Sequence, residues 1–141
     1  MKSKQYELPQ ASESTEQIYL FRWAALQECV YPELELMYHI PNGGYRNKAE
    51  AARLKMEGVK SGVPDICLPC ARGGYHGLYI EMKIKGNTTS ENQKRWIRLL
   101  KEQDYFVTVC YGQEEAISVI VNYLKQKKGV KRVENNINNK P

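Results

Sequence analysis

The chain has 141 residues, and its content of 42% hydrophobic and 26% charged residues is typical of one globular domain with a single core. No run approaches the roughly 18 consecutive apolar residues of a membrane span, and the N-terminus MKSKQYELPQASES lacks the apolar stretch of a secretory signal. The net charge of +5 falls on residues 125–141, because residues 1–124 hold fifteen basic and fifteen acidic side chains. We therefore expect a cytoplasmic protein without a membrane partner.

The first half of the chain predicts two helices separated by a short strand. After a flexible lead-in over residues 1–11, apolar residues at helical spacing predict a helix from about 14 to 30, with Ser14 and Gln17 as a capping box. Residues 35–40 are typical of a strand, which the turn sequence Pro-Asn-Gly-Gly at 41–44 closes. Asn47 is the expected cap of a short second helix, and Gly58 is expected to end it.

The second half predicts a hairpin followed by alternating helices and strands. Strands at 65–69 and 78–84 flank a turn with two glycines, and a helix follows from the cap Ser90 to about 103. A strand at 105–111 and a helix at 113–125 complete the order αβββαβα once the short helix is set aside. This order predicts an α/β fold in which helices flank a mixed central sheet.

The domain limits follow from the same pattern. Residues 1–124 are expected to form one domain, and residues 125–141 a basic, disordered tail with little apolar content. Such a tail fits sequence-independent contacts to DNA phosphates and a purely solubilising role equally well.

The strand expected at 78–84 carries the most informative side chains. Successive side chains of a strand point to opposite faces, so the apolar residues at its even positions share one face, which is the core side. Glu81 and Lys83 share the other face, about 6.6 Å apart at roughly 3.3 Å per residue. By itself this pattern also fits a surface charge pair.

Asp65 indicates a chemical role for the Glu81 and Lys83 pair. It opens the strand that a hairpin joins to the Glu81 strand, so Asp65 can lie beside Glu81. Two carboxylates in contact oppose each other's ionisation, and a hard divalent cation such as Mg²⁺ resolves the conflict. Such a cation polarises a phosphoryl oxygen and lowers the pKa of a bound water. Lys83 can then steady the charge that grows on the phosphate, or orient that water.

The same residues carry a family resemblance. Pro64-Asp65, some fifteen intervening residues and Glu81-x-Lys83 resemble the PD-(D/E)xK nuclease signature. The resemblance to the VRR-NUC branch of that superfamily covers about residues 16–124 and includes Gln93 and three segments: IPNGG at 40–44, GVKSGVPDICLP at 58–69 and GLYIEMK at 77–83. The first of these segments fits the small stand-alone versions of phages and bacteria.

The resemblance implies a metal-dependent DNA nuclease with a restriction-endonuclease-like αβββαβ core. It implies Mg²⁺ as cofactor, with Mn²⁺ an alternative. The implied metal ligands are Asp65, Glu81, the backbone carbonyl of Met82 and a first-helix glutamate, for which Glu16 is the best match and Glu13 and Glu28 are weaker ones. The implied catalytic residues are Asp65, Glu81, Lys83 and Gln93.

Substrate and partners also follow from the resemblance. Stand-alone relatives resemble junction-resolving enzymes, which implies branched DNA as substrate and a homodimer with two active sites related by a twofold axis. The implied location is a bacterial or phage-infected cell. Candidate DNA contacts are Lys60, Lys94, Arg95 and Arg98. The basic residues of the helix, Lys94, Arg95 and Arg98, also fit a solvated helix face. That face lies opposite Trp96, Leu99 and Leu100.

Two other functions fit the sequence. The first is an inactive DNA-binding module on the same fold, although binding alone does not require clustered carboxylates facing phosphate. The second is a small interaction protein stabilised by zinc at Cys67, Cys70 and His76. No second half-site follows this pair, so structural cysteines, with Cys29 and Cys110 among them, are the favoured interpretation.

Overall fold

The computed structural model describes residues 11–42 and 47–130. Its centre is a four-stranded sheet in the order β1-β2-β3-β4. The strands are β1 (Tyr38–His39), β2 (Ile66–Leu68), β3 (Leu78–Lys83) and β4 (Phe106–Tyr111). The pairs β1–β2 and β2–β3 are antiparallel and β3–β4 is parallel, so the sheet is mixed, as the element order predicts.

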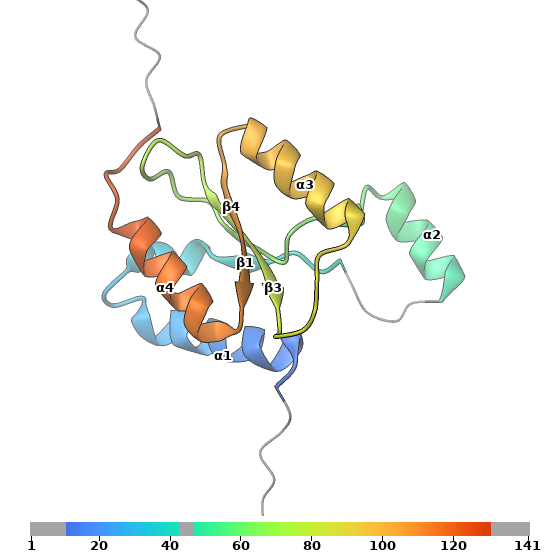
Figure 1. Cartoon of the computed structure of the whole chain (residues 1–141), viewed down its shortest axis with the longest axis horizontal. Helices are drawn as coiled ribbons and strands as arrows, with labels where there is room; N and C mark the ends of the chain where they lie inside the picture. The colour runs from blue at the N-terminus through green and yellow to red at the C-terminus, as the bar shows by residue number, and fades with distance from the viewer. Residues whose placement is uncertain (1–10, 43–46, 131–141) are drawn as a thin grey trace, which may run out of the picture.

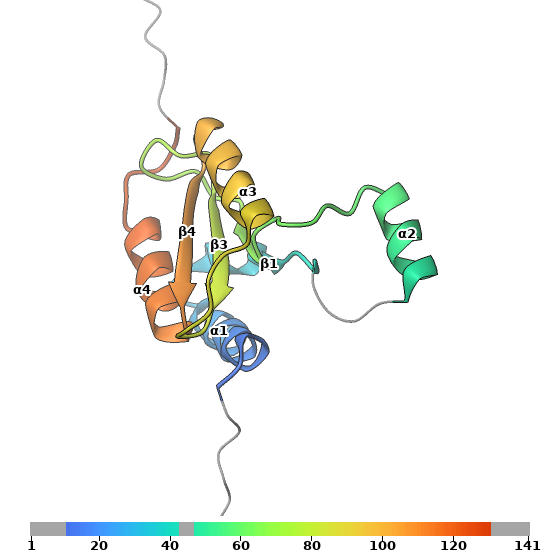
Figure 2. The same cartoon turned by 45° about the vertical axis from the view of Figure 1, so that its right-hand side comes forward.

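Helices cover both faces of this sheet. They are α1 (Glu13–Gln27), α2 (Lys48–Met56), α3 (Glu91–Glu102) and α4 (Gln113–Leu124), with a 3-10 helix η1 at Pro32–Leu36. Helices α1 and α4 pack on each other and on β3, while α3 packs on β4 from the other face (Figure 1). Helix α2 stands apart from the body on the side of α3 (Figure 2). Within the described ranges, no helix has the length and apolar character that crossing a membrane requires.

The core lies between the sheet and the α1–α4 layer. Leu78, Ile80 and Met82 of β3 are at most 1% exposed, and they share one cluster with Leu20 of α1 and Ile120 of α4. The alternation read from the sequence is therefore confirmed, and the odd positions of β3 face the α3 side. The helix caps expected at Asn47 and Ser90 are confirmed as well.

Two expected elements differ from the structure. Helix α1 starts earlier than predicted, because the N-cap is Ser12, whose Oγ accepts a hydrogen bond from the Thr15 N–H at 3.1 Å. The strand expected at 35–40 is shorter in the structure, because its first two residues belong to η1, whose first turn holds Pro32. Proline fixes a helical φ at such a position, and only Tyr38–His39 remain to pair with β2.

The start of the expected tail is ordered. The Gly73 N–H donates to the Lys127 carbonyl at 2.8 Å, and the Gly129 N–H donates to the Ala71 carbonyl at 3.2 Å. Residues 125–130 thus pack on the β2–β3 connection instead of belonging to a disordered tail. The rest of the tail (131–141), most of the lead-in (1–10) and the two glycines of the predicted 41–44 turn lie outside the described residues.

Candidate active site

The fold brings four sequence-predicted residues together on the α3 face of the sheet. Asp65 directly precedes β2, Glu81 and Lys83 lie on β3, and Gln93 lies in the first turn of α3. Because β2 and β3 pair Ile66 with Ile80, the same register continued by one residue sets Asp65 opposite Glu81.

Asp65 is held through both its side chain and its backbone. Its Oδ2 accepts a hydrogen bond from the Met82 N–H at 2.7 Å. Its carbonyl oxygen accepts from the Ile40 N–H at 2.7 Å and from the His39 Nδ1 at 2.7 Å. The side chain thereby continues the β2–β3 ladder one step beyond the backbone pairing, which fixes the carboxylate on a rigid element.

Glu81 is a buried carboxylate with one unsatisfied oxygen. The residue is 2% exposed. Its Oε1 accepts from the Gln93 Nε2 at 2.7 Å and lies 3.6 Å from the Lys83 Nζ. Its Oε2 is buried and has no hydrogen-bond partner among the residues that the structure describes. Since buried charged oxygens are normally paired, this atom is placed to receive a cation or a proton.

Burial raises the pKa values of both Asp65 and Glu81. Burial, followed by the charge of Asp65, raises the pKa of Glu81 to about 8, although the Lys83 ammonium opposes the shift. Burial also raises the pKa of Asp65, against the hydrogen bond from the Met82 N–H. The pair therefore resists carrying two negative charges at neutral pH unless an additional cation lies beside it.

Gln93 links the helix cap to the carboxylate. Its Oε1 accepts from the Ser90 N–H at 2.8 Å in a capping box. This contact fixes the amide orientation, because the oxygen must face the N–H and the NH₂ group must then face Glu81. Gln93 therefore holds the Glu81 Oε1 and leaves the Oε2 free.

A cavity of about 190 Å³ opens over Asp65, Glu81 and Gln93. The first-helix residue on its wall is Glu13, whose Oε1 accepts from the Asn87 Nδ2 at 3.0 Å. The wall also includes the loop 61–63, which precedes Asp65.

The structure gives the first-helix glutamates different contacts. The Oε2 of Glu16 accepts from the Gln113 N–H at 2.9 Å, so Glu16 caps the N-terminus of α4 and does not line the cavity. Glu28 is the C-cap residue at the far end of α1. Because α1 enters the site with its first residue, Glu13 is the carboxylate that reaches it.

The residues present fit a hard divalent cation. In the described part of the chain, no three His, Cys, Asp or Glu side chains gather closely enough to hold a metal unaided. Mg²⁺ usually takes only one or two protein carboxylates and completes its shell with water and substrate phosphate. Asp65 and Glu81 provide such a pair, with one buried oxygen available.

The cysteines do not form the zinc site considered above. Cys67 lies between Tyr38 and Tyr79 in a cross-strand row, whereas Cys70 packs in the core cluster. His76 is exposed, with its ring 5.8 Å from that of Tyr105. A structural zinc site requires four ligands around one point, which this arrangement does not offer.

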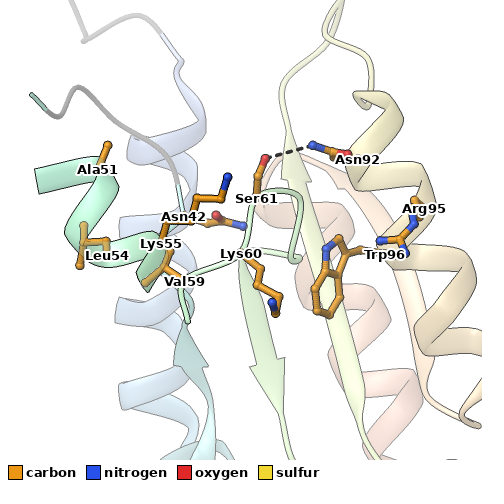
Figure 3. Close-up of a pocket in the computed structure, with 10 residues that line it drawn as sticks. All are labelled: Asn42, Ala51, Leu54, Lys55, Val59, Lys60, Ser61, Asn92, Arg95 and Trp96. Atoms are coloured by element: carbon orange, nitrogen blue, oxygen red, sulfur yellow. Dashed lines mark hydrogen bonds between the residues drawn. The ribbon is translucent and has the colours of Figure 1, made fainter. Parts of the chain in front are cut away.

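The candidate DNA contacts separate into two groups. Lys60 and Arg95 line a larger cavity of about 670 Å³ between α2 and α3 (Figure 3). Lys94 pairs instead with Glu91 at 3.3 Å, and Arg98 does not line this cavity.

Sequence reasoning missed one residue of the larger cavity. Trp96 lines it, although the sequence placed this residue on the packed face of its helix. The available signal was spacing along the helix, since Arg95 and Trp96 lie three and four residues after Asn92, and residues three and four apart share a helix face.

Comparisons with known proteins identify the family of the chain. The VRR-NUC domain model matches residues 10–114. A solved structure described as a VRR_NUC domain protein is 34% identical, superposes with a TM-score of 0.74, and covers 89% of this chain and 100% of its own. No curated protein matches the chain.

Proposed function

The chain belongs to the VRR-NUC family of nucleases, and we propose that it hydrolyses DNA phosphodiester bonds with Mg²⁺ or Mn²⁺ held by Asp65 and Glu81. The observation that carries this proposal is the buried, unpartnered Oε2 of Glu81 opposite a second carboxylate. Such an arrangement is unfavourable for a protein that only stabilises its own fold, and it suits a cation-binding site.

Further ligands are proposed around this pair. The N–H and C=O of one strand residue point to the same side. The Met82 carbonyl therefore faces the edge where the Met82 N–H meets Asp65. Glu13 approaches from the cavity wall. When bound, a divalent cation supplies polarisation of a phosphoryl oxygen and a water of lowered pKa.

Lys83 and Gln93 have distinct proposed roles. Lys83 is 7% exposed and is fixed on a buried strand, so its ammonium is preorganised to stabilise negative charge growing on the phosphate. Gln93 does not act on the phosphate in this proposal. It orients the Glu81 carboxylate through the 2.7 Å hydrogen bond.

We propose branched DNA, such as a four-way junction, as substrate and a homodimer as the acting form. The support is the family resemblance together with symmetry, because paired cuts across a junction need two sites related by a twofold axis.

A cleavage assay tests the proposed function. We expect cutting of labelled DNA with Mg²⁺ or Mn²⁺ and none with a chelator, with branched DNA (a four-way junction or a flap) cut faster than a linear duplex. Mass measurement in solution tests the dimer. DNA binding without cutting under every metal condition would show that the chain is an inactive binding module.

The two first-helix glutamates provide a matched comparison. Glu13→Ala is expected to raise the Mg²⁺ concentration needed for half-maximal cutting about 10- to 100-fold, with little change in stability. Glu16→Ala is expected to leave this concentration unchanged and to lower stability by about 1 kcal/mol, because it removes the cap of α4. Metal titration and thermal melting of both variants measure the difference. The reverse pattern would restore Glu16 as the metal-site residue.

Two arginines of α3 provide another comparison. Arg95 lines the larger cavity and Arg98 does not. A plot of log affinity against log salt concentration has a negative slope. Arg95→Ala is therefore expected to reduce the magnitude of this slope by about 0.9, the effect of one lost phosphate contact. Arg98→Ala should leave the slope unchanged. Fluorescence anisotropy with labelled DNA in chelator measures both, and equal slopes for the two variants would argue against the cavity as part of the DNA path.

A further inference from the structure

The cavity between α2 and α3 adjoins the proposed metal site. Asn42 and Ser61 line both the cavity over Asp65 and Glu81 and the larger one of about 670 Å³. A group held in the larger cavity therefore lies next to whatever is bound at the carboxylates. The volume of the larger cavity is within the range of roughly 300–1,000 Å³ typical of pockets for small organic molecules.

The lining of the larger cavity matches the parts of a nucleotide. Lys55, Lys60 and Arg95 bring three positive charges, and its ten lining residues include no carboxylate. Asn92 adds an amide, and Trp96 adds an aromatic face (Figure 3). Cations suit phosphates, and an indole suits the flat face of a base.

Trp96 is half-buried and lines two cavities. Figure 3 shows its indole projecting from α3 toward the Lys60 side chain. It lines a second cavity of about 410 Å³, together with Pro41 and Val59. Helix α3 contributes no fully buried residue to the core. The indole is thus available to a ligand.

The wall of the larger cavity that faces α3 is formed by the loop of Lys60 and Ser61, and this loop is held in place close to the proposed metal site. Gly62 has a φ of +92°, and a Cβ there would lie 2.7 Å from the Asn92 backbone. The neighbouring Ser61 Oγ accepts a hydrogen bond from the Asn92 Nδ2 at 3.3 Å. This close approach holds Lys60 at a set position against α3, only five residues before Asp65.

We propose that Lys60, Arg95 and Trp96 bind one unpaired nucleotide of the strand whose neighbouring phosphate lies at Asp65 and Glu81. The base stacks on Trp96 and the flanking phosphates contact the two cations. In continuous duplex DNA every base is already stacked, so the cavity selects DNA with an unpaired nucleotide beside the cut. This inference rests on the proposed nuclease function and narrows its substrate class.

Tryptophan fluorescence tests the inference directly. The chain has two tryptophans, so Trp23→Phe leaves Trp96 as the sole indole. In chelator, where no cutting is expected, we expect quenching by a duplex with a three-nucleotide flap. A fully paired dumbbell, closed at both ends by non-nucleotide linkers, and a flap made of abasic residues should both fail to quench. Equal quenching by all three DNAs would overturn the inference.

Variants at Trp96 separate stacking from structural effects. Trp96→Ala should weaken flap binding roughly 5- to 150-fold, the effect of one lost base stack, and should leave dumbbell binding unchanged. Trp96→Phe should keep most of the flap preference. Equal weakening for both DNAs would indicate a structural role and would overturn the inference. If DNA is cut with Mg²⁺ but Trp96 shows no base-dependent quenching, this inference fails alone. If base-dependent quenching occurs and no DNA is cut, the nuclease proposal fails instead.

Discussion

Replacing Asp65 with asparagine is expected to abolish DNA cleavage while leaving the protein folded. The asparagine amide oxygen can still accept the hydrogen bond from the Met82 N–H that Asp65 Oδ2 accepts at 2.7 Å. The side chain loses its negative charge, however, and with it the main attraction for a divalent cation beside Glu81. Initial rates on labelled DNA, calorimetric titration with Mg²⁺ and thermal melting measure the three consequences.

Asp65→Ala is the structural control. It should abolish cleavage equally, but it also leaves the Met82 N–H without its partner, which costs about 1–3 kcal/mol of stability. Near-normal cutting by Asp65→Asn would show that the site is misassigned, whatever the result for the alanine variant.

Lys83→Met separates metal binding from charge stabilisation. The Lys83 Nζ lies 3.6 Å from the Glu81 Oε1, so removing this cation leaves the carboxylates free for Mg²⁺ and should not weaken its binding. Cleavage should nevertheless fall about 10²- to 10³-fold, the usual effect of losing one preorganised group that stabilises transition-state charge. Loss of Mg²⁺ binding in this variant would argue that Lys83 acts by shaping the site.

The parts of the fold that the sequence predicts depend on local rules. Alternation along β3 separates the core residues from Glu81 and Lys83, and the capping box at Ser90 and Gln93 starts α3 at the correct residue. Each of these rules involves residues a few positions apart. The opposition of Asp65 and Glu81 was also within reach, because a hairpin fixes the register of its strands.

Other features depend on contacts between distant segments. Spacing within α1 does not distinguish Glu13 from Glu16, because the difference lies in how α1 meets α4 and the cavity. The near-complete burial of Glu81 reflects the interior place of β3 between β2 and β4 and the contact of the Gln93 side chain with its carboxylate. The place of Trp96 depends on the loop that Gly62 brings against α3. A pattern along one segment holds no information on such neighbours.

Glu81→Gln is expected to stabilise the protein at high pH in the absence of metal. The pKa of Glu81 is raised from its ordinary value of 4.5 to about 8, so the folded state holds this proton more tightly than the unfolded chain. Its contribution to stability is therefore present below pH 4.5 and is lost as the pH rises through 8. The raised pKa of Asp65 acts in the same direction. At 1.36 kcal/mol per pKa unit, the rise from 4.5 to about 8 corresponds to a loss on the order of 5 kcal/mol.

Urea unfolding between pH 4 and pH 9 tests this expectation. In chelator, the unmodified protein should lose stability relative to Glu81→Gln as the pH rises. Mg²⁺ should restore it, because a cation pairs with the ionised carboxylates and binds only the folded state. The glutamine variant should show only the part of the loss that comes from Asp65, and a correspondingly smaller restoration. Glu91→Gln, which changes a side chain that is 93% exposed, should behave as the unmodified protein does. If the unmodified protein and Glu81→Gln show the same pH dependence in chelator, Glu81 is not a carboxylate strained by burial. The central argument for a cation at this site would then be lost.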